Sequence, residues 1–72
     1  MTTADDFVAS FATVIGLEAP NAETIEKLLD IAGLAAHSSE RWAAPITCYL
    51  IGQAGLSPED ALAAVQTTVN GA

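Results

Sequence analysis

The stretch AHSSERWAAPITCYLIGQAG, residues 36–55, holds the chain's only histidine, arginine, tryptophan, tyrosine and cysteine. No charged residue occurs between Arg41 and Glu59. Pro45 is typical of a first helical turn, which predicts a helix over residues 43–54. A helix without a charged face is normally surrounded by protein. We therefore expect this helix to be either the central helix of the domain or half of an interface.

On both sides of this stretch, the apolar spacing predicts three more helices, over residues 3–15, 22–38 and 58–69. Each starts after a residue whose side chain can accept a hydrogen bond from a free amide of the first turn, namely Thr3, Asn21 and Ser57. Gly16 and Gly55 are typical of left-handed residues that end helices. The fold expected is all-α, a single four-helix domain over residues 1–72, and its short loops favour an up-down arrangement.

Size and composition indicate a need for a partner. A chain of 72 residues has a small core, and its single Cys48 excludes an internal disulfide. One histidine and one cysteine cannot form a closed zinc site, so no metal and no cofactor is expected. Because 51% of the residues are hydrophobic and 15% are charged, much apolar surface must stay exposed unless a partner covers it.

The net charge of the chain argues against two classes of partner. Nine acidic residues against Lys27 and Arg41 give a net charge of −7, which disfavours nucleic acids and anionic membranes. No apolar run is long enough to span a bilayer, and the acidic start is unlike a secretory signal. These features predict a cytoplasmic protein. Six acids are expected to form a solvated face or, alternatively, to attract a basic partner: Asp5, Asp6, Glu18, Glu23, Glu26 and Asp30.

The junction between residues 37 and 41 is the one cluster of recognition-type groups. Arg41 and His37 could hold an anion, with the serines between them and the free amides of the next helix. The simpler alternative is that both side chains cap helix ends, or that Arg41 pairs with Glu40. Catalysis is not expected, because Cys48 lies on an apolar helix and no convergent acid–base set is visible.

Trp42 and Tyr49 lie seven residues apart, on one side of the helix that begins near Trp42. Aromatic side chains at this spacing are either core residues or interface anchors. The apolar excess of the chain favours an interface, for which five residues are the candidates: Arg41, Trp42, Ile46, Tyr49 and Leu50.

Residues 28–55 resemble a small actinobacterial helical domain family of unknown function, whose members occur alone or appended to molybdenum cofactor guanylyltransferase-like domains. The resemblance covers about a third of the chain and is most specific from His37 to Pro45. Trp42 stands where the family has a proline. The residues that carry the resemblance are Leu28, Leu29, Asp30, Ala32, Ala36, His37, Glu40, Arg41, Ala43, Ala44, Pro45, Ile46, Thr47, Leu50 and Gly52. It implies an all-helical domain associated with molybdenum enzymes or with maturation of their cofactor, and no established activity.

Together these observations predict a non-catalytic accessory or small subunit. It would dock through residues 43–54 and the His37–Arg41 junction onto a larger redox enzyme or maturation protein. One alternative is a module in which Arg41 and His37 bind an anionic ligand. Another is a self-associating helical domain whose third helix pairs across a two-fold axis.

Overall fold

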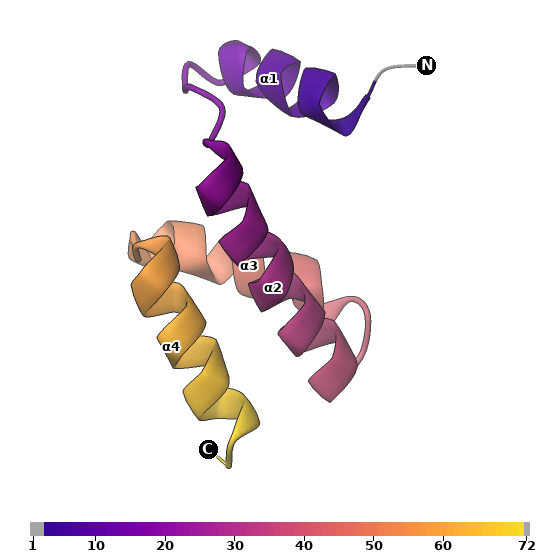
Figure 1. The fold of residues 1–72 in the computed structure, drawn as a ribbon, viewed down its shortest axis with the longest axis vertical. Coiled ribbons are helices and arrows are strands. Elements are labelled where there is room, and N and C mark those ends of the chain that lie inside the picture. The colour runs from indigo at the N-terminus through magenta and orange to yellow at the C-terminus, as the bar shows by residue number, and fades with distance from the viewer. Residues whose placement is uncertain (1–2, 72) are drawn as a thin grey trace.

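The computed structural model describes residues 3–71, which form four helices (Figure 1). In chain order these are α1 (Ala4–Val14), α2 (Ala22–Ser38), α3 (Ala43–Ala54) and α4 (Pro58–Val69). No strand occurs in residues 3–71, so the all-α prediction is confirmed. The predicted helix limits agree with the structure to within one residue.

Side-chain caps fix the starts of three helices. At each of them a side-chain oxygen of the cap accepts a hydrogen bond from the amide three residues later, as the sequence predicts. The donor–acceptor pairs are Asp6 to Thr3 at 3.1 Å, Thr24 to Asn21 at 2.8 Å and Asp60 to Ser57 at 3.1 Å. The helix α3 differs, because Trp42 stands at its N-cap and makes no side-chain hydrogen bond there.

Left-handed glycines end α1 and α3. Gly16 has φ 79° and Gly55 has φ 67°, a conformation that costs residues with a Cβ atom. The amide of the next leucine then donates to a carbonyl five residues back, from Leu17 to Ala12 at 2.8 Å and from Leu56 to Ile51 at 3.3 Å. Both helix ends therefore have the geometry that the Gly-Leu pairs predict.

The core lies where α2 packs against both α3 and α4. Ile31 of α2 and Ala61 of α4 are fully buried, and Val65 is nearly so. Partly buried side chains surround this group: Leu28, Leu34, Ile51 and Leu62. The central helix is thus α2. The alternative in which residues 43–54 form the central helix is wrong, because no residue of α3 is buried.

The helix α1 lies apart from the other three. Figure 1 shows it beyond the N-terminal end of α2, joined to it by a loop and separated from α3 and α4. Packing of α1 against any other helix is slight. An up-down bundle of all four helices is therefore not formed, because α1 does not turn back along α2.

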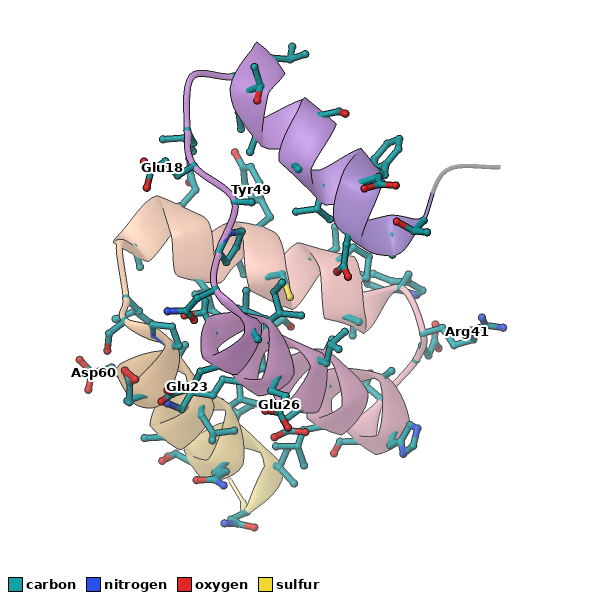
Figure 2. All side chains as sticks on the ribbon, turned by 45° about the horizontal axis from the view of Figure 1, so that its top comes forward. Glu18, Glu23, Glu26, Arg41, Tyr49 and Asp60 are labelled. Carbon is teal, nitrogen blue, oxygen red and sulfur yellow. The ribbon has the colours of Figure 1, made fainter. Side chains whose placement is uncertain are left out.

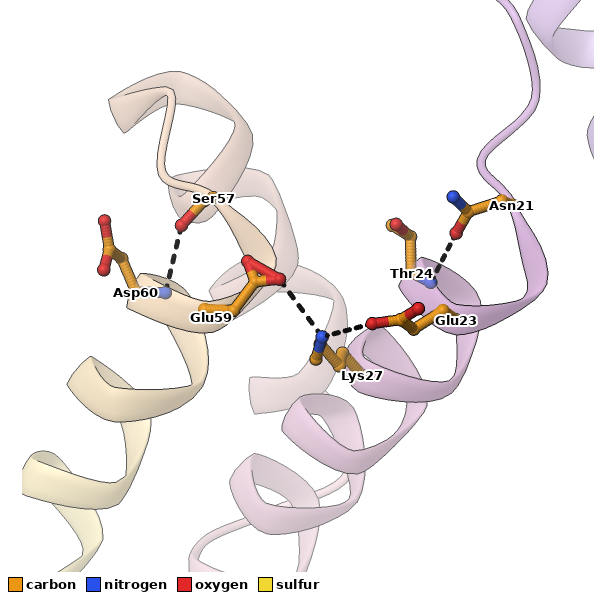
Figure 3. Close-up of polar contacts among 7 residues, drawn as sticks. All are labelled: Asn21, Glu23, Thr24, Lys27, Ser57, Glu59 and Asp60. Carbon is orange, nitrogen blue, oxygen red and sulfur yellow. Dashed lines mark hydrogen bonds and ion pairs between the residues drawn. The ribbon is translucent and has the colours of Figure 1, made fainter.

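One ion-pair bridge ties α2 to α4 (Figure 3). The Lys27 ammonium group donates to Glu23 and to Glu59, each at 3.1 Å. Hydrogen bonds with Glu23 and then Glu59 raise the pKa of Lys27 above its ordinary value. The pKa of Glu59 is lowered, first by its own backbone amide at the start of α4 and second by Lys27. One of the chain's two cationic side chains is thus fully engaged within the fold.

None of the helices within residues 3–71 has both the length and the apolar character needed to cross a membrane.

Candidate protein interface

The helix α3 begins directly after a tight turn. The amides of Ala43 and Ala44 donate to the carbonyls of Glu40 and Arg41, at 2.9 and 3.2 Å. Ser39 is non-helical, with φ −145° and ψ −117°, so α2 and α3 are separate helices rather than one kinked helix. The turn sends α3 across α2 (Figure 1). The two helices pack together, while several large side chains of α3 stay exposed.

The uncovered side of α3 carries large apolar groups, which we call the outer face: Trp42, Ile46, Tyr49 and Leu50. The first three follow at intervals of four and three residues, which places them along one side of a helix. Their exposed fractions are 66% for Trp42, 50% for Ile46 and 63% for Tyr49. Figure 2 shows Tyr49 projecting from the side of α3 that faces away from α2 and α4. The alternative in which Trp42 and Tyr49 are core residues is therefore wrong.

Trp42 is held in place by its neighbour. Its indole Nε1–H donates to a carboxylate oxygen of Glu40 at 2.6 Å, the length of a strong hydrogen bond to a charged acceptor. The ring remains largely exposed, so this bond orients the indole without removing it from solvent. An oriented, exposed aromatic ring loses little side-chain freedom when a partner covers it.

His37 and Arg41 do not meet the expectation that they cap helix ends. Both side chains are exposed, and within residues 3–71 neither makes a hydrogen bond or an ion pair. Glu40, the acid expected beside Arg41, binds Trp42 instead. Figure 2 shows Arg41 extending from the junction away from the helices. The Arg41 guanidinium is therefore free to meet a group outside the described part of the chain.

The reactive side chains are scattered rather than convergent. Cys48 is half-buried on α3, whereas His37 lies at the end of α2. Among residues 3–71 no three histidine, cysteine, aspartate or glutamate side chains lie close enough to hold a metal ion. Within residues 3–71 no side-chain hydrogen bond or ion pair links His37 to a serine or an acid of the junction.

A second feature lies beside the outer face. A groove of about 580 Å³ lies between α3 and α4, and Ala35 from the C-terminal part of α2 also lines it. Leu50 contributes to both the groove and the outer face. The lining contains no charged side chain and consists of Ala35, Ser38, Ser39, Ala43, Thr47, Leu50, Ile51, Ala54, Leu56, Ala61, Ala64, Val65, Thr68 and Val69.

Comparison with known families matches residues 1–72 to DUF6457, described as a domain of unknown function. The chain belongs to the DUF6457 family. Neither a curated protein nor a solved structure gave a significant match in the same comparisons. The DUF6457 match agrees with the resemblance to a family of unknown function, and it spans the full domain rather than one segment. No activity follows from membership of DUF6457, so function has to be argued from the surface.

The sequence pointed to the four outer-face residues but missed the groove. The α4 side of the groove is formed by small residues such as Ala61 and Ala64, whose side chains have no charged or hydrogen-bonding group. The spacing of alanines on α4 was a signal, since small side chains on one helix side leave room for another helix. The exposure of the apolar side of α1 was also not foreseen, because an amphipathic pattern predicts packing.

Proposed function

We propose that this DUF6457 domain is a non-catalytic interaction module that docks on a larger protein through the outer face of α3. The observation that carries the proposal is the exposure of Trp42, Ile46, Tyr49 and Leu50, each at least half exposed. Trp42 is the N-cap of α3, and the other three lie on α3, which has no charged side chain. Clusters of exposed aromatic and aliphatic groups mark protein interfaces more often than free surface.

The chemistry of the outer face fits a protein surface better than a small molecule. Trp42 and Tyr49 supply large, rigid contact groups with a polar end, as is common at energetic centres of interfaces. The exposed Arg41 guanidinium lies at the edge of this face, where it can pair with a partner carboxylate. The scattered positions of His37 and Cys48 support the non-catalytic part of the proposal.

The resemblance to the actinobacterial family supplies a class of partner for this proposal. It directs the search to molybdenum-dependent oxidoreductases and to proteins that mature their cofactor. The domain would then act as an accessory or small subunit. Binding of an anion by Arg41 and His37 stays a prediction from sequence, and a thermal-shift titration with inorganic phosphate tests it.

Affinity capture with matched variants tests the docking proposal. Tagged wild-type protein is compared with Tyr49→Gln on the outer face and with Leu29→Gln on the exposed side of α2. Tyr49 and Leu29 have similar exposed fractions, 63% and 66%. We expect one stoichiometric partner with wild type and with Leu29→Gln, and its loss with Tyr49→Gln. Metal analysis of the captured complex then tests the molybdenum link. A wild-type protein that is captured alone, or a partner that all three retain, contradicts docking through the outer face.

A further inference from the structure

The helix α1 is well formed yet nearly unpacked. Its apolar side chains Phe7, Phe11 and Val14 are 66%, 55% and 81% exposed, and Ala12 is its one buried residue. Helices this short are marginal in water, so most of their stability has to come from a packing surface. Where α1 does approach the start of α2, a hollow of about 270 Å³ remains, lined in part by Val8 and Ile25.

The groove between α3 and α4 is the complementary surface. It is apolar, uncharged and open, and it occupies the position that a further helix would fill in a helix bundle. The 11 residues of α1 span about 16 Å, close to the roughly 18 Å of the 12-residue α3 that forms one wall. Charged residues on α1 are restricted to Asp5 and Asp6 in its first turn, so the rest of the helix brings no charge into an apolar groove.

The total exposed area of the chain is larger than that of a compact monomer of the same mass. A compact monomer of 7.4 kDa exposes about 4,200 Å², whereas this chain exposes 5487 Å². Its radius of gyration is 12.9 Å, compared with about 11 Å for a compact domain of this length. The excess is about 1,300 Å² per chain, so covering it on two copies would bury an area in the range of obligate dimers.

A second copy of the chain can place its α1 helix in the groove. Within one chain α1 is attached at the start of α2 and lies outside the groove, which is lined from Leu56 and Ala61 as far as Ser38 and Ser39 at the opposite end of α2. The α1 helix of another copy is not held by that connection. A two-fold arrangement also covers α1 and the groove of both chains at once and leaves no open end.

We infer that the chain forms a two-fold dimer in which α1 of each copy lies in the groove between α3 and α4 of the other. The interface uses α1 and the groove. Of the outer face it covers Leu50, which lines the groove, and it leaves Trp42, Ile46 and Tyr49 exposed. It therefore goes beyond the docking proposal and does not depend on it. The net charge of −7 on each copy opposes association, so added salt strengthens the dimer.

Sedimentation equilibrium of the full chain tests this exchange of α1 helices between two copies. One variant and one matched control are used for α1 and for the groove. Phe11→Glu places a carboxylate on the apolar side of α1, and Ala9→Glu places one on its opposite side. Ala64→Glu places a carboxylate in the groove wall, and Ala63→Glu places one on the neighbouring, exposed position of α4. All four are exposed sites outside the buried core, and circular dichroism verifies that each variant is helical.

We expect wild type and both controls to be dimeric. Phe11→Glu and Ala64→Glu each weaken the dimer by about 10- to 100-fold, because each buries an unpaired carboxylate. A monomeric wild type, or dimers that both variants retain, would each overturn the inference.

The two proposals fail separately. Tyr49→Gln leaves the dimer intact while it abolishes partner capture, and Ala64→Glu does the reverse if the partner binds each protomer on its own. Loss of the dimer in Tyr49→Gln as well as in Ala64→Glu would contradict the exchange geometry, because Tyr49 lies outside the groove.

Discussion

Two isoleucines of this chain have the same side chain and opposite surroundings. Ile31 of α2 is fully buried, whereas Ile46 of α3 is half exposed. Their helices differ in charge pattern. The α2 helix has acids on one side and apolar residues on the other, so its apolar side is the side that packs against other helices. The α3 helix has no charged side, and its apolar groups therefore point both toward α2 and away from it.

The comparison shows that apolar content and burial are separate properties in a domain this small. A core built around Ile31, Ala61 and Val65 leaves the larger apolar groups of α1 and α3 outside it. The least charged helix is consequently the one with no buried residue. Stability is concentrated where α2 packs against α3 and α4, and the exposed apolar groups remain available for association.

The largest expected effect comes from truncating the buried isoleucine. Ile31→Ala should lower the free energy of unfolding by about 3 kcal/mol, because it removes the largest fully buried side chain and leaves a cavity. Ile46→Ala should cost less than about 1 kcal/mol, because Ile46 already contacts solvent. Urea unfolding followed by circular dichroism, at protein concentrations too low for association, measures both losses.

Equal losses for the two substitutions would break the comparison between α2 and α3. Such a result would mean that Ile46 is buried in solution even at low concentration. A loss at Ile46 that grows with protein concentration would instead show association through the outer face of α3.

Substitutions at two glycines are expected to change the free energy of unfolding by an intermediate amount, in opposite directions. Gly33→Ala within α2 should stabilise the domain by up to about 1 kcal/mol, because its added Cβ atom meets nothing within 4 Å and alanine favours helix. Gly55→Ala at the end of α3 should cost about 1–2 kcal/mol, because residue 55 has a left-handed φ of 67°. Melting temperatures from circular dichroism give both signs.

Destabilisation by Gly33→Ala would show that α2 is packed more closely than the structure indicates, and so would widen its difference from α3. It would mean that another helix approaches α2 at Gly33 in solution, since no atom of the described chain does so. Stabilisation by Gly55→Ala would show that the left-handed end of α3 does not form in solution.

Helix limits were predictable because local chemistry determines them. Ser57, Asn21 and Thr3 each satisfy a free amide within three residues, and Gly55 permits a conformation that other residues resist. Signals of this kind act over one helical turn. They do not depend on where the helix packs, so the sequence alone was sufficient.

Which helices pack together was not predictable, because packing depends on residues that are far apart in the sequence. An apolar residue such as Tyr49 or Phe11 has the same local pattern whether it faces a core, a groove or a partner. The choice of α2 as the central helix depends on how the turn at Ser39 directs α3, which has no short-range sequence signature. The engagement of Lys27 with Glu59 on α4 likewise joins residues 32 positions apart.

The smallest expected effect comes from the bridge between α2 and α4, which Glu59→Gln removes. The pKa of Glu59 is lowered in the folded state from an ordinary value of 4.5, so the carboxylate favours folding when ionised. Its contribution is therefore present above pH 4.5 and is lost as the pH falls below that value. The pKa of Lys27 is raised above 10.5, so its contribution is present below pH 10.5 and is lost at higher pH.

Wild type should consequently be more stable than Glu59→Gln at neutral pH, by a small margin because both carboxylates and the ammonium group contact solvent. Unfolding measured from pH 7 to about pH 3 should show the margin shrinking as Glu59 becomes protonated. Glu26→Gln is the control, since Glu26 adjoins Lys27 in sequence and forms no ion pair within residues 3–71. A margin that persists in acid would locate the effect of Glu59→Gln in helix packing rather than in charge. The contact between α2 and α4 would then depend on apolar burial alone, as the contrast between Ile31 and Ile46 implies for the rest of the core.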